Sequence, residues 1–173
     1  MVDTVVVQDL VEEEKEAVRL LLVESYQQYE QEYTDPQVWK AYLQDIIASV
    51  DNPHVDKILV AKNNQGIIGS LQLFQSSEQA YERPELQIYS PIIRLLAVHP
   101  SARGHGVAQA LLKASVDYAN TFGAKNLYLH TSDSMQKAIR LYEWLGFKRD
   151  QTKEFMKNDI LVKCYRFDLY TKL

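Results

Sequence analysis

Residues 93–112 combine the residue types that a phosphate-binding site needs. An apolar run ends at Pro100, a basic and glycine-rich turn follows over residues 103–106, and an amphipathic helical pattern begins at Val107. At the start of a helix the first amide N–H groups have no partner within the helix, and the helix dipole is positive. Glycine carries no Cβ, so a ligand can approach the turn closely. These residues predict a site for a phosphorylated cofactor.

Two common phosphate-binding loops fit this turn poorly. A dinucleotide loop has the pattern G-x-G-x-x-G, with an acidic residue about twenty positions later. Gly104 and Gly106 match its first two glycines, but Gln109 stands at the third and no carboxylate lies near Asn126. A nucleoside triphosphate loop requires Gly-Lys followed by Ser or Thr, and the chain has no such tripeptide. The sequence therefore disfavours a pyridine-nucleotide enzyme and an ATP-binding loop.

A second segment points to a different cofactor. It reads A-I-R-L-Y-E-W-L-G-F over residues 138–147, and the turn itself reads R-x-x-G-x-A over residues 103–108, after L-A-V-H-P. In this order and at this separation the two segments resemble the acyl-CoA loop and the tyrosine-containing segment of the GNAT superfamily of N-acetyltransferases. The close resemblance covers residues 88–150. It implies a GNAT-like fold and transfer of an acetyl group from acetyl-CoA.

The resemblance assigns two groups of backbone atoms to acetyl-CoA. Amides of the turn and of the first helical residues would grip the pyrophosphate; these residues are Gly104, His105, Gly106, Val107 and Ala108. Backbone groups of Leu96, Ala97 and Val98 would pair with the pantetheine arm as if it were another strand. Backbone donors in a fixed turn bind oxyanions without ordering flexible side chains. Arg103 has two interpretations, a charge placed on a phosphate or a solvated turn arginine.

Acetyl transfer also needs an oxyanion donor and a proton for the leaving thiolate. The resemblance implies that the N–H of Val98 stabilises the oxyanion and that Tyr142 is the general acid. Tyr142 is also in phase with apolar helical positions, so a core tyrosine is the alternative. The general base does not emerge from the sequence: Glu82, Glu85, His130 and water all stay open.

Neither metal nor cysteine chemistry is predicted. His99 and His105 have no partners at metal-ligand spacing, so no metal site is expected. Cys164, the only cysteine, alternates with large apolar residues in a late strand pattern and is interpreted as a core residue. We therefore expect direct attack of the acceptor on acetyl-CoA in a ternary complex, not a cysteine-bound intermediate.

Composition predicts one soluble domain over residues 1–173. A formal net charge of −4 disfavours nucleic acid as a partner, since nucleic-acid binding usually needs a basic face. The apolar runs are too short to span a membrane, the first residues lack a basic secretory start, and a lone cysteine suits a reducing compartment. We expect a cytoplasmic protein. Pairing of a late strand, 160–169, across a homodimer is left open.

The periodicity of apolar residues predicts the elements that position these groups. Helices are expected over 11–30, from Pro36 onward, over 107–122 and before Gly146; the expected strands are 5–8, 57–62, 67–74, 88–98, 126–131, 147–149 and 160–169. Residues 75–87 are expected to form a long loop. The resulting fold class is α/β (α+β): a mixed central sheet of about six or seven strands flanked by about four helices.

The leading functional hypothesis is acetylation of a primary amine, either on a small molecule or as a protein amino group. In the family the first two helices and the loop before the central strand usually shape the acceptor site. Here they carry aromatic and acidic residues together: Tyr26, Tyr29, Glu30, Glu32, Tyr33, Trp39, Tyr81, Glu82 and Glu85. Such a set suits a cationic amine, although core aromatics beside solvated acids explain it equally well. The alternative function is an acyl-CoA-binding regulatory module that transfers no acetyl group. The acyl-chain preference stays open.

Overall fold

The computed structural model describes residues 4–169. Within them the α-helices are α1 (Lys15–Tyr26), α2 (Pro36–Ala48), α3 (Ser77–Tyr81), α4 (Val107–Thr121) and α5 (Gln136–Trp144). The strands in the same range are β1 (Val6–Asp9), β2 (Lys57–Asn63), β3 (Gly66–Phe74), β4 (Ile92–Val98), β5 (Asn126–Thr131), β6 (Lys148–Arg149), β7 (Phe155–Lys157) and β8 (Ile160–Asp168). The mixed α+β class is confirmed, with one short helix and one strand beyond the expected numbers. None of these helices combines the length and apolar character that a membrane crossing requires.

The contacts divide the chain into two compact units. Unit 1 takes the chain up to Gln72 together with Leu95–Ala114, and unit 2 takes Leu73–Arg94 together with the chain from Ser115. The division falls inside β3, β4 and α4, so these elements contribute to both units. The residues of the glycine-rich turn belong to unit 1, and the tyrosine-containing segment belongs to unit 2.

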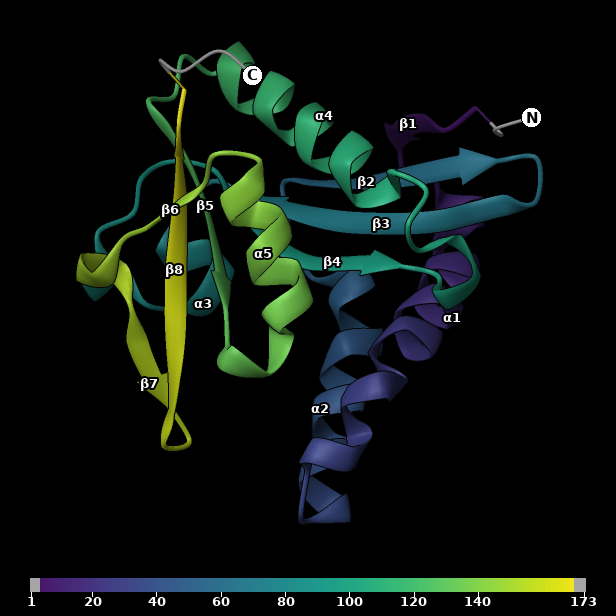
Figure 1. Cartoon of the computed structure of the whole chain (residues 1–173), viewed down its shortest axis with the longest axis horizontal. Coiled ribbons are helices and arrows are strands. Elements are labelled where there is room, and N and C mark those ends of the chain that lie inside the picture. The colour runs from purple at the N-terminus through teal and green to yellow at the C-terminus, as the bar shows by residue number, and fades with distance from the viewer. Residues whose placement is uncertain (1–3, 170–173) are drawn as a thin grey trace. The chain divides into compact units, whose positions relative to one another are not determined.

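Unit 1 contains one end of the sheet and two helices. β1 pairs antiparallel with β2, and the last half of β4 adjoins β3 through a bond from the His99 N–H to the Ile68 carbonyl at 2.8 Å. Helices α1 and α2 lie side by side (Figure 1). Helix α2 begins where the sequence predicts, because the Asp35 carboxylate accepts the Gln37 amide at 2.9 Å and Pro36 occupies the first helical position.

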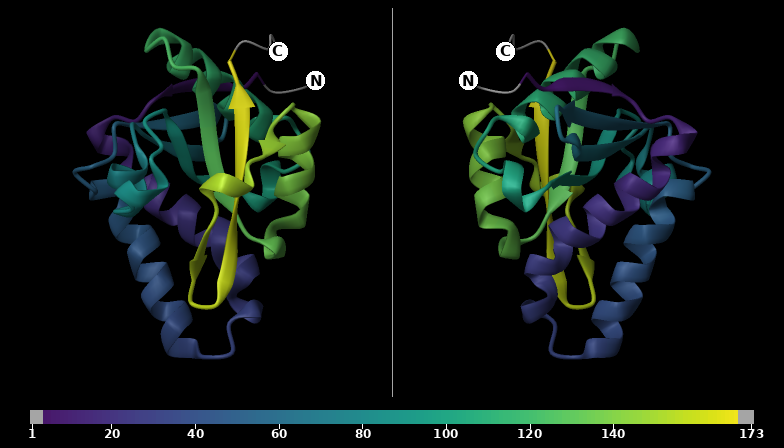
Figure 2. Two further views of the ribbon diagram at one scale, coloured as in Figure 1. Left: turned by 90° about the vertical axis from the view of Figure 1, so that its left-hand side faces the viewer. Right: turned by 90° about the vertical axis from the view of Figure 1, so that its right-hand side faces the viewer.

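Unit 2 is built around β8. This strand pairs antiparallel with β5 along one edge and with the short strands β6 and β7 along the other, while β5 pairs in parallel with the start of β4. Figure 2 shows β8 running beside β5 and turning back from β7 in a hairpin. Strand β8 is therefore paired within the chain on one edge from Lys163 to Asp168 and on the other edge at both of its ends.

The segment before β4 differs from the expected loop and strand. Residues 77–81 form helix α3, which Ser76 caps by accepting the Gln79 amide. Strand β4 begins at Ile92 and not at residue 88. Ile88 is buried, but its N–H and C=O are bonded to the side chain and backbone of Ser77, so it closes a turn instead of extending the strand. Pro91, which has no N–H to donate to a ladder, separates this turn from β4.

Candidate active site

The glycine-rich turn leaves its backbone open to solvent. Gly104 and Gly106 have φ angles of +82° and +80°, which side chains rarely adopt, and a Cβ built on either would meet no atom within 4 Å. The turn is exposed from Arg103 to Gly106, while Val107, the first residue of α4, is buried. The Gly106 carbonyl accepts the Ala110 amide at 3.0 Å, so the amides of the first helical turn lie next to this space. This open cradle beside a helix N-terminus fits a pyrophosphate.

A small residue on β3 sets the position of α4 in unit 1. A Cβ on Gly69 would lie 2.7 Å from Val107 Cγ1 and 3.0 Å from Leu111 Cδ1. Glycine at this position therefore allows the first turns of α4 to pack closely on the strand. Sequence patterns did not predict this role, because an isolated glycine in a strand pattern does not reveal which helix crosses it.

Strand β4 changes direction before it reaches the turn. Leu95 has a φ of +53°, a left-handed conformation that bends a strand, as in a β-bulge. Strand β4 pairs with β5 at Ile92 and Ile93, before this bend. Since successive backbone groups alternate in direction and the His99 N–H points to β3, the N–H and C=O of Val98 point away from β3.

Three consecutive residues at the end of α1 contact the last half of β4 and the turn. The Tyr26 hydroxyl donates to the Leu96 carbonyl at 3.2 Å, and the Ser25 hydroxyl donates to the Val98 carbonyl at 3.3 Å. The Glu24 carboxylate lies 2.6 Å from Nε2 of His99. From the sequence, Tyr26 was predicted only as one of the aromatic residues near the acceptor. No signal in the sequence pairs α1 with residues about 70 positions later.

The Arg103 side chain has a protein partner that neither of its two sequence interpretations included. Its guanidinium donates to the Ser25 carbonyl at 3.2 Å, at the end of α1, although the side chain is exposed. A carbonyl near a helix C-terminus is a favourable acceptor for a cation. The guanidinium therefore links the turn to α1.

The tyrosine-containing segment in unit 2 is held by aromatic packing. Tyr142 is buried on α5, with its ring centroid 6.0 Å from that of Phe147, which in turn lies 5.3 Å from Phe167 on β8. Gly146 has a φ of +105°, and a Cβ there would touch the Phe167 ring at 3.4 Å. The Phe147 amide donates to the Tyr142 carbonyl at 2.9 Å. The L-G-F part of the motif thus reverses the chain so that Phe147 packs beside Tyr142.

Among the candidate bases, His130 is occupied on both ring nitrogens. Its Nε2 lies 2.9 Å from the Lys153 carbonyl, which can only accept, so Nε2 carries the proton and Nδ1 accepts from the Tyr81 hydroxyl at 3.0 Å. Burial lowers the pKa of His130 to about 4 and raises the pKa of Tyr81 above its usual range. This arrangement describes a neutral histidine that joins β5 to the segments on either side.

The two acidic candidates lie at the surface of the segment before β4. Glu82 is exposed in a left-handed conformation at the end of α3, and Glu85 is exposed and 3.7 Å from the Arg83 guanidinium. Arg83 also lies over the Phe155 ring at 4.3 Å. Both carboxylates are therefore open to solvent at this surface.

The cysteine and the turn histidine show no arrangement for nucleophilic or metal chemistry. Cys164 is fully buried on β8, and burial raises the pKa of its thiol above the usual value, which disfavours the thiolate. His105 is exposed at the tip of the turn. Residues 4–169 contain no cluster of three or more His, Cys, Asp or Glu side chains placed to hold a metal ion.

The aromatic residues proposed for the acceptor form ring contacts within unit 1. Tyr33 lies 5.2 Å from Trp39 and 5.7 Å from Tyr42 between ring centroids, and Tyr29 lies 5.8 Å from Tyr26. Trp39 and Tyr26 are buried, whereas the other three rings are half-exposed. The pKa of Tyr33 is raised, mainly by partial burial and to a lesser extent by the negative charge of the nearby Glu32 carboxylate. Tyr81 belongs to unit 2, where it packs against His130.

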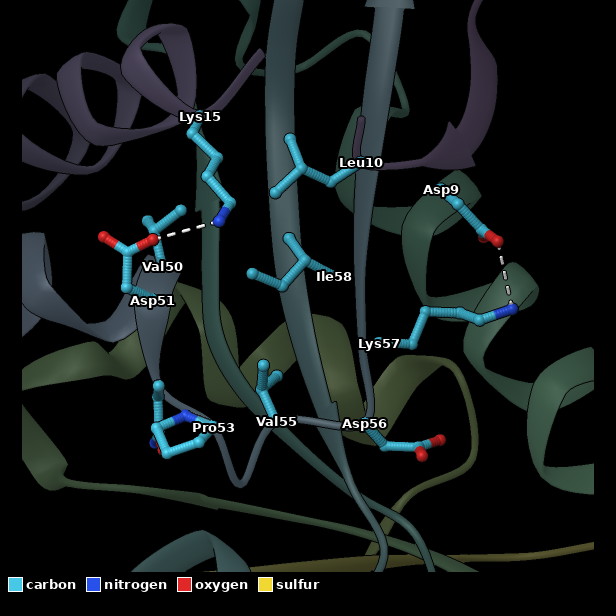
Figure 3. A pocket seen from close by; sticks show the side chains of 11 residues that line it. Asp9, Leu10, Lys15, Val50, Asp51, Pro53, Val55, Asp56, Lys57 and Ile58 are labelled. Atoms are coloured by element: carbon cyan, nitrogen blue, oxygen red, sulfur yellow. Dashed lines mark hydrogen bonds and ion pairs between the residues drawn. The ribbon is translucent and has the colours of Figure 1, made fainter. Parts of the chain in front are cut away.

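A pocket of about 460 Å³ in unit 1 lies among other residues (Figure 3). Leu10, Val55 and Ile58 supply apolar surface, and four of its charged side chains form two ion pairs. Lys15 contacts Asp51 at 3.0 Å and Lys57 contacts Asp9 at 3.3 Å. None of the residues predicted for acetyl-CoA or for the acceptor lines this pocket.

Solved structures share this fold at low sequence identity. The PaiA N-acetyltransferase of Thermoplasma acidophilum in complex with coenzyme A superposes with a TM-score of 0.69 at 14% identity, over 95% of this chain and 99% of that one. YncA of Salmonella typhimurium, solved with its cofactor acetyl-CoA, superposes with a TM-score of 0.62 at 16% identity, over 95% and 94% of the two chains. At these identities the likeness establishes the fold.

Sequence comparison identifies the family. The profile of the acetyltransferase (GNAT) family matches residues 15–147. The uncharacterised N-acetyltransferase YhfO of Bacillus subtilis is 35% identical over 129 residues, which cover 75% of this chain and 80% of that protein. N-acetyltransferase 8F1 of Rattus norvegicus is 28% identical over 121 residues, and the chain spans about half the length of this and other mammalian relatives. The chain therefore belongs to the GNAT family and is an N-acetyltransferase that takes its acetyl group from acetyl-CoA.

Proposed function

We propose that this protein acetylates a primary amine by direct attack on acetyl-CoA within a ternary complex. The observation that carries the proposal is the turn at Gly104 and Gly106, whose backbone conformation excludes side chains and leaves open space before α4. The full burial of Cys164 supports direct attack, because a covalent acetyl-cysteine would need an accessible thiolate.

We assign the backbone of Gly104, His105, Gly106, Val107 and Ala108 to the pyrophosphate, and the backbone of Leu96, Ala97 and Val98 to the pantetheine arm. Acetyl-CoA supplies the activated thioester. The Val98 N–H points away from β3 and so is free of that strand. This direction supports two roles for it: hydrogen bonding to the pantetheine arm, and stabilisation of the thioester oxygen as negative charge develops there. The Arg103 guanidinium, held at the end of α1, adds positive charge beside the turn.

The proposed chemistry needs two proton transfers. The neutral amine nitrogen forms a bond to the acetyl carbon while the carbon–sulfur bond breaks, the nitrogen loses its surplus proton, and the thiolate gains one. We assign the second transfer to the Tyr142 hydroxyl, which can donate its proton to a thiolate. For the first we favour water, because His130 is engaged on both nitrogens and Glu82 and Glu85 are exposed.

We propose a cationic amine as the acceptor, either a small molecule or a protein amino group. The half-exposed rings of Tyr29, Tyr33 and Tyr42 and the exposed carboxylates of Glu30 and Glu32 lie in one segment of unit 1. Aromatic faces and carboxylates both attract ammonium groups. We further propose that residues 1–173 act as one acetyltransferase domain, to be checked by the activity of this chain expressed by itself.

The test combines cofactor binding with turnover. Isothermal titration with coenzyme A and acetyl-CoA should show binding, and absence of binding at millimolar ligand would overturn the proposal. Release of free thiol is then followed over a panel of diamines, amino acids, aminoglycosides and peptides with free amino termini. Tyr142→Phe serves as the catalytic variant. Binding without turnover of any acceptor would favour the alternative, an acyl-CoA-binding regulatory module.

A further inference from the structure

The end of α1 supplies donors to the stretch of β4 that is assigned to the pantetheine arm. We call Glu24, Ser25 and Tyr26 the α1 clasp. Ser25 and Tyr26 are 5% and 6% exposed, and their hydroxyls donate to the carbonyls of Val98 and Leu96. These are the carbonyls on the side of β4 that faces away from β3.

The bend at Leu95 explains why these carbonyls need other partners. Leu95 is a non-glycine residue in the left-handed region, which side chains disfavour, and the pairs of β4 with β5 at Ile92 and Ile93 lie before it. Beyond the bend, the carbonyls of Leu96 and Val98 take their donors from the α1 clasp. Both distances, 3.2 and 3.3 Å, exceed the usual 2.7–2.8 Å for a hydroxyl donor. Each carbonyl oxygen also has a second lone pair, so it can accept a ligand N–H while the hydroxyl stays in place.

The α1 clasp also holds the turn. Glu24 contacts His99, whose Nδ1 accepts the Ser101 amide at 3.2 Å and so fixes the first residues after β4. The backbone carbonyl of Ser25 accepts from the Arg103 guanidinium at 3.2 Å. One end of one helix thus contacts the backbone carbonyls of Leu96 and Val98 and the side chains of His99 and Arg103.

We propose that Ser25 and Tyr26 are positioning residues for acetyl-CoA, and that their hydroxyls hold the bent half of β4 in the conformation that pairs with the pantetheine arm. This inference rests on the proposed binding of acetyl-CoA along Leu96–Val98. It assigns no contact between Tyr26 and the reacting atoms. The hydroxyls act through the backbone that they orient.

The experiment uses the full chain with Tyr26→Phe and Ser25→Ala, which remove one hydroxyl each and keep most of the packing. The matched controls are Tyr118→Phe and Ser115→Ala, which remove a hydroxyl from equally buried positions in α4 that have no assigned role. Coenzyme A affinity is measured by isothermal titration at a temperature where urea denaturation shows every variant to be folded. Amide hydrogen exchange at Leu96 and Val98 is measured without ligand.

We expect Tyr26→Phe to weaken coenzyme A binding about three- to ten-fold, Ser25→Ala by a similar factor, and the controls by less than two-fold. Exchange at Leu96 and Val98 should accelerate in the clasp variants and not in the controls. Lower stability with unchanged affinity and exchange would show that the hydroxyls only stabilise the fold. Tighter binding would show that they compete with the ligand, and either result overturns the inference. Failure of the unsubstituted protein to bind coenzyme A would instead overturn the proposed function, and the inference with it.

Discussion

The turn before α4 and the segment that carries Tyr142 are built in different ways. The turn is exposed, offers backbone amides, and is fixed by hydrogen bonds from α1. The Tyr142 segment is buried, and three aromatic rings in succession fix it. The first region should tolerate changes of side chain but not of backbone conformation. The second should depend on single side chains.

The sharpest test of this contrast is the loss of one hydroxyl from the buried segment. Tyr142→Phe keeps the ring contact with Phe147 and removes the proton donor, so we expect kcat to fall about 100-fold while the Kd for coenzyme A changes by less than two-fold. Free-thiol release with the best acceptor of the panel gives kcat, and titration gives Kd. Tyr118→Phe is the matched control. An unchanged kcat would make Tyr142 a core residue only.

The side-chain network of unit 2 also predicts how stability depends on pH. The pKa of His130 is about 4 in the folded protein and about 6.5 in an unfolded chain. Between pH 6.5 and pH 4, His130 binds a proton in the unfolded state but stays neutral in the folded state. The free energy of unfolding therefore decreases as the pH falls from 6.5 towards 4. Between pH 7 and pH 5 we expect a loss of about 2 kcal/mol.

Urea denaturation at pH 7 and pH 5 measures this loss. His130→Gln should lower stability at pH 7 and show a smaller loss between the two pH values than the unsubstituted protein. The comparison removes the contribution of carboxylates common to both proteins. Equal losses in the two proteins would mean that His130 titrates normally.

In the turn, coenzyme A binding should depend on the backbone conformation. Gly106→Ala places a Cβ at a φ of +80° and in the open space assigned to phosphate, so we expect coenzyme A to bind about 10-fold more weakly. Gly66→Ala is a close control, because Gly66 has a φ of +113° and equally open surroundings in the β2–β3 hairpin. It should cost stability and leave the Kd unchanged. Equal effects of both substitutions on Kd would contradict the assignment.

Among these substitutions, removal of the Arg103 side chain should have the smallest effect on coenzyme A binding. Arg103→Ala is expected to raise the Kd for coenzyme A about three-fold at low ionic strength, and the effect should shrink in high salt because exposed charges are screened. Lys125→Ala removes the same charge from an exposed residue of unit 2 and serves as the control. A salt-independent loss would instead show that Arg103 acts through its bond to the Ser25 carbonyl.

Most elements could be predicted because their signals are local. Asp35 and Pro36 start α2 by capping chemistry, and Gly104, Gly106 and Gly146 stand where the backbone needs positive φ. The extension of β4 back to Ile88 was wrong. An apolar residue signals burial, but its hydrogen-bond partner decides between strand and turn, and here that partner is Ser77.

The sequence by itself determined the two motifs and the family, and it predicted that the turn binds phosphate. Each motif depends on residues close together in the sequence, whose backbone preferences act wherever the chain goes. Only the tertiary structure decided that the end of α1 contacts Leu96 and Val98, that Gly69 admits α4, and that His130 is neutral and fully bonded. Each of these contacts is between residues that lie 23 to 73 positions apart in the sequence. Which of many compatible residues come into contact is decided by the packing of the whole fold.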